Sequence, residues 1–207
     1  MGDTGAAEKA GPPGRVLTRA FYARSPLLVG PELLGKILCR VRRGVVTSGR
    51  IVEVEAYLGA DDPASHAYRG MTRRNLAMFG PAGRAYVYFT YGNHFCMNVV
   101  TGDDGAASAV LIRALEPIEG IPVMRRRRGR DAVEELTSGP GKLCQALGID
   151  RKLYGHELTD RPLWILDDDT APPRYLATPR IGISTAVDLP YRYLVPDSAY
   201  VSRTRRP

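Results

Sequence analysis

The residues best suited to chemistry stand in and just after the stretch Arg50–Tyr57, which holds two carboxylates and a tyrosine and is soon followed by a histidine. Successive side chains of a β-strand point to opposite faces, so Glu53, Glu55 and Tyr57 would share one face, with the carboxylates roughly 6–7 Å apart. Together with His66, this set could stack a flat ligand and activate a water molecule. The alternative interpretation is an edge strand with a solvated face, on which both glutamates only pair with arginines.

The strand that must position these groups is predicted for 50–57 from strict alternation and β-branched residues. Val52, Val54 and Ala56 would form its core face, and Ile51 would lie with the carboxylates on the other face. A turn is expected directly afterwards, because Gly, Asp and Pro cluster there.

A tyrosine-rich hairpin is the second informative unit. Two strand-like runs, 85–90 and 95–100, are joined by Tyr91-Gly92-Asn93-His94, and the central Gly-Asn pair supplies the positive φ angles that tight hairpin turns require. The expected faces are Tyr86, Tyr88 and Thr90 on one side and Val87 and Phe89 on the other. Tyr91 has little core to enter, so we expect it to project as a contact residue, whereas Tyr86 could equally be a packing residue.

Arg113 stands inside the strongly apolar, strand-like run 108–115. An arginine is costly to bury without a partner, so this one requires a carboxylate or a phosphate. Glu53 or Glu55 would be its partner in a structural ion pair.

Two further basic segments could contact phosphates. Arg125–Arg128 and Arg130 fall in a helix predicted for 116–130 and form either a solvated face or a phosphate-contact patch. Ser138–Lys142 opens a helix that ends near Gly148. A leucine after the lysine departs from the phosphate-loop pattern, but the first helix amides could still hold one phosphate.

The remaining elements follow from periodicity and from Gly and Pro signals. Helices are predicted for 21–34 and from Thr72 to about Phe79, and strands for 36–41, 45–57, 162–166, 180–184 and 191–195.

Length and composition are typical of one globular domain, because 207 residues with 44% hydrophobic content can bury a sizeable core. We divide the chain into a tail expected to be disordered (1–14), a single domain (15–202) and a frayed end (203–207). The net charge of +7 favours an anionic partner, nucleic acid before a membrane.

The cysteines and the apolar segments limit the class further. Cys39, Cys96 and Cys144 are odd in number and lie in apolar elements, so buried thiols are expected rather than disulfides or a zinc site. No apolar run is long enough for a membrane span, and Met1–Arg15 lacks a signal-peptide core. We expect a soluble protein of a reducing compartment, the cytoplasm and nucleoid of a bacterium or the nucleus of a eukaryote.

Several blocks of the chain resemble the signature of the alkyladenine (3-methyladenine, methylpurine) DNA glycosylase family. They are Arg50–Gly59 with His66, Tyr86–Gly92, Phe95–Asn98, Leu111–Pro117 and Ser138–Leu147. The resemblance extends over about residues 20–200. It implies an α+β fold in a single domain, with a curved, mostly antiparallel β-sheet, flanking helices and a projecting β-hairpin (86–100) that enters the DNA minor groove.

The resemblance also implies roles for individual residues. Glu55 matches the general base that activates the attacking water, and Arg113 matches an arginine beside that water. The flipped base would lie in a pocket formed by Tyr57, His66, Tyr88 and Asn98. Of these, the asparagine would crowd the exocyclic amine of normal guanine.

The hairpin tip would contact the DNA itself. Tyr91 matches the residue that wedges into the duplex where the base has left. Candidates for backbone contacts are Gly92, Asn93, His94, Arg125, Arg126 and Lys142. Asn93 stands where animal relatives carry a larger apolar residue, which leaves open how firmly the tip fills the minor groove.

The implied reaction is base excision from double-stranded DNA containing damaged purines. The enzyme would flip the base out of the stack and hydrolyse its N-glycosidic bond, leaving an abasic site. We expect a monofunctional, monomeric enzyme without lyase activity, because no lysine stands near the focal strands, and we expect no metal and no cofactor. The preference among 3-methyladenine, 7-methylguanine, hypoxanthine and ethenoadenine is left open.

Two other classes of protein fit parts of the pattern. A catalytically inert nucleic-acid-binding module would explain the charge and the tyrosines, but carboxylates on a phosphate-binding face would repel its ligand. A metal-dependent nuclease or hydrolase could use Glu53, Glu55, Asp61 and Asp62, and a chelator would abolish its activity.

Overall fold

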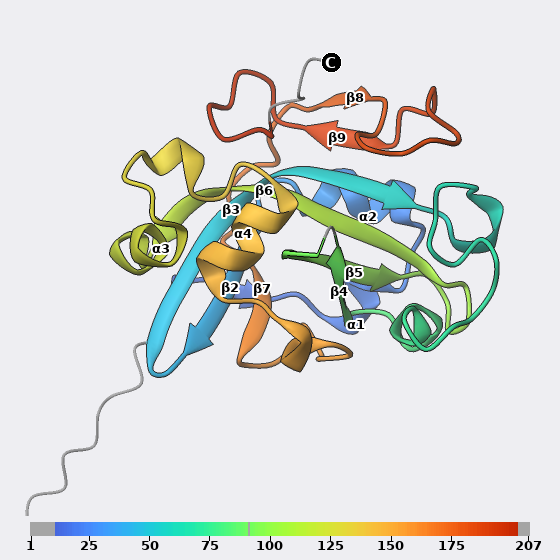
Figure 1. Ribbon diagram of the computed structural model, residues 1–207, viewed down its shortest axis with the longest axis horizontal. Coiled ribbons are helices and arrows are strands. Elements are labelled where there is room, and N and C mark those ends of the chain that lie inside the picture. Colours follow the sequence, from blue (N-terminus) through green and yellow to red (C-terminus); the bar gives the residue numbers. More distant parts are fainter. Residues whose placement is uncertain (1–10, 91, 203–207) are drawn as a thin grey trace, which may run out of the picture.

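Nine strands within residues 11–90 and 92–202, the part of the chain that the computed structural model describes, form one curved antiparallel sheet (Figure 1). Seven of them follow the order β1-β7-β2-β3-β6-β5-β4, and β9 pairs with both β3 and β8. Their bounds are β1 Arg15–Val16, β2 Ile37–Arg42, β3 Val45–Tyr57, β4 Ala85–Thr90, β5 His94–Thr101, β6 Ser108–Glu119, β7 Leu163–Asp167, β8 Leu176–Thr178 and β9 Arg192–Leu194.

Four α-helices accompany the sheet in the described residues, namely α1 Arg19–Tyr22, α2 Pro26–Leu33, α3 Ile121–Arg128 and α4 Pro140–Leu147. The helix predicted for 21–34 is divided as the Ser-Pro signal indicates. Ser25 caps α2 by accepting a hydrogen bond from the Leu27 amide, and a proline occupies the first turn. Short 3₁₀ turns at Gly59–Asp61, Leu76–Phe79, Val133–Glu135 and Arg151–Leu153 complete the elements.

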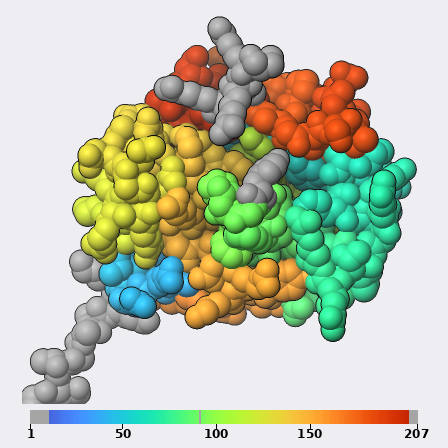
Figure 2. All heavy atoms as spheres, in the orientation of Figure 1, coloured from blue at the N-terminus to red at the C-terminus, as the bar shows by residue number. Residues whose placement is uncertain are grey.

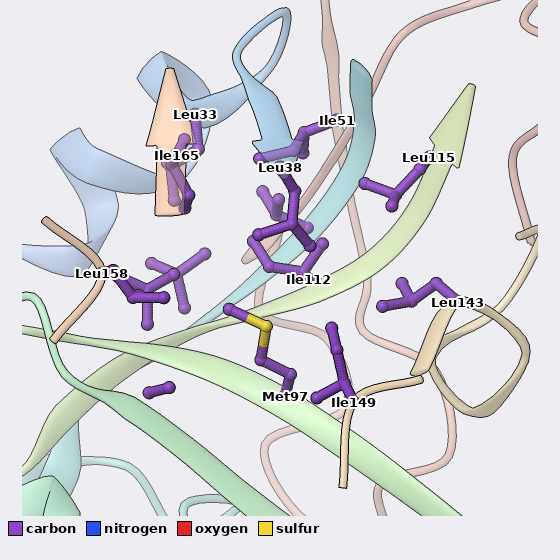
Figure 3. Packing of buried hydrophobic residues seen from close by; sticks show 14 of the residues in the cluster. Leu33, Leu38, Ile51, Met97, Ile112, Leu115, Leu143, Ile149, Leu158 and Ile165 are labelled. Carbon is purple, nitrogen blue, oxygen red and sulfur yellow. The ribbon is translucent and has the colours of Figure 1, made fainter. Parts of the chain in front are cut away.

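The main core lies where α2 and α4 pack against the sheet (Figure 3). Leu33 of α2 and Leu143 of α4 are fully buried in the same cluster as Met97 and Ile112 of the central strands. The three cysteines are buried free thiols, as expected from their apolar surroundings. The single domain with a mostly antiparallel sheet and flanking helices confirms that part of the predicted fold.

β3 is a central strand, which excludes the edge-strand alternative. Its first half pairs with β2 through residues 45–50, and residues 53–55 pair instead with β9, while β6 runs along the other side. A β-bulge interrupts the β6 register between Ile51 and Val54. The strand therefore exchanges one neighbour for another at the position where its two carboxylates begin.

Because of the bulge, the side chains of β3 that face the core differ from those predicted. Ile51, not Val52, joins Val54 and Ala56 in the main core cluster. An extra residue in a bulge shifts the alternation of side chains by one position. Glu53 and Glu55 are both 0% exposed, which excludes the solvated face that the alternative interpretation assigned to them.

Four predicted elements differ from the structure. The helix predicted from Thr72 to about Phe79 is only a 3₁₀ turn over Leu76–Phe79, and the three residues before it form a turn. The helix predicted for 116–130 is strand up to Glu119, because β6 continues to pair with β3, and only then does Gly120, at a φ of 73°, allow α3 to begin. Residues 180–184 form a loop rather than a strand. In the hairpin, β5 already begins at His94, and Gly92 takes a positive φ of 71° whereas Asn93 does not.

Among the described residues, no helix is long and apolar enough to cross a membrane.

Candidate active site

A cavity of about 420 Å³ lies among β3, the hairpin β4–β5 and two loops. The predicted residues Tyr57, His66, Tyr88, Asn98 and Arg113 all line it, together with Pro63–Ser65, Met78, Tyr86, Thr90, Cys96, Leu111, Pro140 and Ile181–Thr185. On the face shown in Figure 2, three contributing segments meet: the hairpin in green, the 58–80 region in turquoise and the 175–202 region in orange to red. The structure thus brings the predicted pocket residues together.

Glu55 lies behind the wall of this cavity, and both of its oxygens accept hydrogen bonds. Oε2 accepts one from the Tyr57 hydroxyl at 2.9 Å and lies 3.1 Å from Nη1 of Arg113. Oε1 accepts a bond from the Ile181 amide at 2.7 Å. These donors and the guanidinium fix the position of the carboxylate.

Arg113 contacts both carboxylates of β3, as its position in an apolar strand predicted. Its Nε donates to Oε1 of Glu53 at 2.9 Å, while Nη1 faces Glu55. Burial alone would lower the pKa of the Arg113 guanidinium, but Glu55 and Glu53 outweigh it and raise the pKa. The guanidinium therefore stays charged at the cavity wall.

Tyr57 is held between the glutamate and a buried ion pair. The guanidinium carbon of Arg180 lies 4.6 Å from the centre of the Tyr57 ring, and Arg180 makes a bidentate ion pair with Asp62. Burial, followed by the charge of Glu55, raises the pKa of Tyr57 well above its ordinary value, so its hydroxyl remains a donor. Asp62, which the sequence placed in a turn and among the candidates for a metal-dependent hydrolase, thus helps to fix an aromatic wall of the cavity.

A second part of the cavity wall is an aromatic cluster. His66 and Tyr88 meet edge to face with ring centres 4.6 Å apart, and His66 Nδ1 lies 2.9 Å from the Tyr86 hydroxyl. Burial, helped by the positive charge of Arg74, lowers the pKa of His66. The ring is therefore neutral at pH 7. Tyr86, for which packing and contact roles were both open, is 1% exposed and also lines the cavity.

Asn98 is 4% exposed, and a hydrogen bond fixes its side chain: the amide nitrogen donates to the Tyr86 carbonyl at 3.1 Å. Its position on β5 is fixed by pairing with Tyr86 on one side and Leu111 on the other. An amide held on two strands presents a rigid polar group to any ligand in the cavity.

The predicted DNA-contact residues lie around this cavity or beyond it. Gly92, Asn93 and His94 are exposed on the hairpin, and Tyr91, predicted as the wedge, lies outside the described residues. Of the remaining candidates, Arg125 and Arg126 are exposed on α3, with Arg125 donating to the Asp131 carbonyl, and Lys142 donates to Ser138 at the start of α4.

Comparison with known proteins identifies the family of the chain. The family model "Methylpurine-DNA glycosylase (MPG)" matches residues 20–199. The chain belongs to the methylpurine-DNA glycosylase family. Among its relatives, a protein of Methanoculleus marisnigri is 53% identical over 191 residues, covering 90% of this chain and 98% of the relative. One of Carboxydothermus hydrogenoformans is 51% identical over 190 residues, covering 91% and 99%. Both carry the name "Putative 3-methyladenine DNA glycosylase".

Several side chains and one backbone amide of the site in this methylpurine-DNA glycosylase were not predicted from the sequence. Arg180 and the Ile181 amide come from a loop that was predicted as a strand, and Arg192 and Ser202 come from the last part of the domain. One signal was available. Arg192 stands between two tyrosines in a strand-like run, the same pattern that singled out Arg113.

Each acidic residue proposed for a metal-dependent hydrolase, apart from exposed Asp61, is instead bonded to an arginine. Glu53 and Glu55 face Arg113, and Asp62 faces Arg180. Within 11–90 and 92–202, no three His, Cys, Asp or Glu side chains gather into a group that could hold a metal ion.

Proposed function

We propose that this protein excises alkylated or deaminated purines from double-stranded DNA as a monomeric, monofunctional DNA glycosylase of base excision repair. The observation that carries the proposal is the position of Glu55, bonded to Tyr57 and Arg113 at the wall of an aromatic cavity. The cavity volume of about 420 Å³ falls in the range of roughly 300–1,000 Å³ typical of small-molecule sites. The names of the relatives support 3-methyladenine as one substrate.

In the proposed reaction the damaged base leaves the stack and enters the cavity between Tyr57 and the His66–Tyr88 pair. Glu55 accepts a proton from a water molecule whose oxygen bonds to the sugar C1′. The bond from C1′ to the base nitrogen breaks, and its electron pair stays on the base. A base alkylated at N3 or N7 carries a positive charge, so it leaves as a neutral molecule and needs no proton.

Glu55 has no solvent-exposed surface, so the water must reach it past a group that also lines the cavity. Tyr57 and Arg113 are the two cavity-lining side chains that contact its Oε2. We propose that the Tyr57 hydroxyl leaves this oxygen when a base stacks on its ring, and that the water takes its place. Arg113 then remains beside the carboxylate, with Nη1 facing Oε2.

Among the described residues that line the cavity there is no lysine, which supports the proposal of hydrolysis without strand cleavage. A lyase reaction would need an amine that forms a Schiff base with the sugar. The wall instead offers a guanidinium and aromatic rings, with the Glu55 carboxylate behind them.

The test is base release from duplexes that carry 7-methylguanine or hypoxanthine, with EDTA present, under single-turnover conditions. We expect the wild type to leave intact abasic strands and Glu55→Gln to be slower by about 10²–10⁴-fold, the usual contribution of a general base. Glu157→Gln, which alters a surface ion pair outside the cavity, is the matched control. Full release by Glu55→Gln would refute the assignment. Binding without any release by wild type would instead indicate the inert module.

A further inference from the structure

Glu53 is a buried carboxylate beside the cavity that the proposed reaction does not use. It is 0% exposed, and its Oε1 accepts bonds from Arg113 Nε at 2.9 Å, Arg192 Nε at 2.7 Å and the Ser202 hydroxyl at 2.7 Å. Its Oε2 accepts the Ser202 amide at 2.6 Å. Four donors hold this carboxylate in place, and a water molecule would have to displace one of them to reach it.

These bonds fix the guanidinium of Arg113 on three sides. Nε donates to Glu53, Nη2 donates to the Ser202 hydroxyl at 3.3 Å, and Nη1 lies 3.1 Å from Glu55. The Ser202 hydroxyl accepts from Arg113 and donates to Glu53, which closes a ring of hydrogen bonds. Rotation of the guanidinium would break at least two of these contacts.

The charges in this cluster are balanced, with Glu53 and Glu55 facing Arg113 and Arg192. Without Glu53, the charge of the Arg113 guanidinium would face Glu55 alone. Glu53 therefore does two things: it orients the guanidinium, and it shares its charge.

We propose that Glu53 and Ser202 are positioning residues, which hold Arg113 so that a single nitrogen reaches Glu55. The inference rests on the proposed role of Glu55 as the general base. It assigns a function to the end of the domain, since Ser202 reaches the site from a position 149 residues after Glu53. Neither positioning residue lines the cavity, so neither touches the substrate.

The experiment compares Ser202→Ala, Ser202→Thr and Ser198→Ala in the full chain. Single-turnover release of 7-methylguanine at saturating enzyme is measured beside affinity for the same duplex. We expect Ser202→Ala to release the base about tenfold more slowly, with affinity within threefold of wild type, because the lost hydroxyl acts only on the chemical step. Ser202→Thr restores a hydroxyl and should recover the rate to within threefold. Ser198 bonds only the nearby Tyr200 amide, so its variant should match wild type.

Two outcomes would overturn the proposal: a folded Ser202→Ala variant with the wild-type rate, or a folded Ser202→Thr variant as slow as Ser202→Ala. If Ser202→Ala does not fold, Ser202→Cys decides, because a thiol preserves the volume but is a weak donor and acceptor. It should be slow, and a wild-type rate would equally count against the role of the hydroxyl. Failure of the proposed function is distinguishable, because it would appear as no base release by wild type or as full release by Glu55→Gln, whereas failure of this inference alone would leave both of those results as expected.

Discussion

Two glutamates two positions apart on one strand have different surroundings and therefore different chemistry. Glu53 is bonded by two arginines and a serine, whereas Glu55 is bonded by one arginine, one tyrosine hydroxyl and one amide. The tyrosine hydroxyl is the one donor of Glu55 that belongs to a stacking residue. Proton transfer is therefore expected at Glu55 and not at Glu53.

The ring and the hydroxyl of Tyr57 are predicted to have separable functions. Tyr57→Phe keeps the stacking surface and frees Oε2 of Glu55, so affinity for lesion-containing duplex should stay within threefold of wild type and the single-turnover rate should not fall. Tyr57→Ala removes the ring and should weaken lesion binding by about 1–3 kcal/mol, the usual stacking contribution. Fluorescence anisotropy and base release measure the two effects. A slower Tyr57→Phe with unchanged affinity would contradict the proposed departure of the hydroxyl.

The Asp62–Arg180 pair should make stability depend on pH in the acid range. Burial raises the pKa of the Asp62 carboxyl, but bonds from Arg180 and from the amides of Ala64 and Leu58 outweigh it, and the pKa lies below its ordinary value of 3.8. The unfolded chain then binds protons before the folded one does. The stabilisation is present above about pH 4 and is lost as the pH falls below it.

Urea unfolding of wild type and Asp62→Asn at pH 6 and pH 3 measures this effect. Wild type should be the more stable at pH 6, and the gap between the two proteins should narrow at pH 3. An equal gap at both pH values would mean that the pair does not stabilise through its charge.

At the residue scale, the sequence predicted contacts that lie within the strands it predicted. The pairing of Arg113 with Glu53 and Glu55 followed from the cost of burying a lone cation. Arg180 and Ser202 could not be predicted, because they come from loops and no local pattern indicates a contact across 118 or 149 residues.

At the scale of elements, the bulge in β3 explains both a wrong prediction and the site. Alternation alone placed Ile51 beside the carboxylates, and one extra residue moved it into the core. Strand existence was predictable from periodicity, but a bulge depends on the neighbouring strands. Here β9 replaces β2 as the partner of β3 next to the bulge.

The hairpin is predicted to depend on a glycine in another element. A Cβ added to Gly141 of α4 would lie 2.9 Å from Cγ of His94, too close for a relaxed contact. Gly141→Ala should therefore displace the hairpin and lower the affinity for DNA several-fold, while the free energy of unfolding changes little. Gly80→Ala, whose new Cβ would meet its nearest neighbour at 3.5 Å, is the control. Equal DNA affinities for the two variants would show that the hairpin does not need this contact.

At the scale of the whole molecule, the net charge of +7 predicts binding that weakens with salt. Arg69, Arg73 and Arg74 are exposed on the segment that borders the cavity, and Arg69 and Arg73 have no ion pair within the described chain. These positions were not among the contacts predicted from the sequence, because no regular element marks them.

Removing Arg69 and Arg73 together should reduce the dependence of affinity on salt. Each lost phosphate contact lowers the slope of log K against log salt by about 0.9. The double alanine variant should therefore show a slope of log affinity against log salt that is smaller in magnitude by about 1–2. Titrations between about 50 and 200 mM NaCl measure it. Arg15→Ala serves as the control. Arg15 belongs to β1, which lies at the other end of the sheet order from the hairpin strand β4. An unchanged slope in the double variant would place the duplex elsewhere.

The bonds from Ser202 to Glu53 also have a consequence for synthesis on the ribosome. Because the site joins the first third of the domain to its last described residue, a nascent chain cannot assemble it until nearly the whole domain has emerged. Chains cut within the segment after β9 would lack Ser202 and its bonds to Glu53 and Arg113. We expect such chains to release bases more slowly than the full chain, because the guanidinium of Arg113 would lose one of the contacts that orient it.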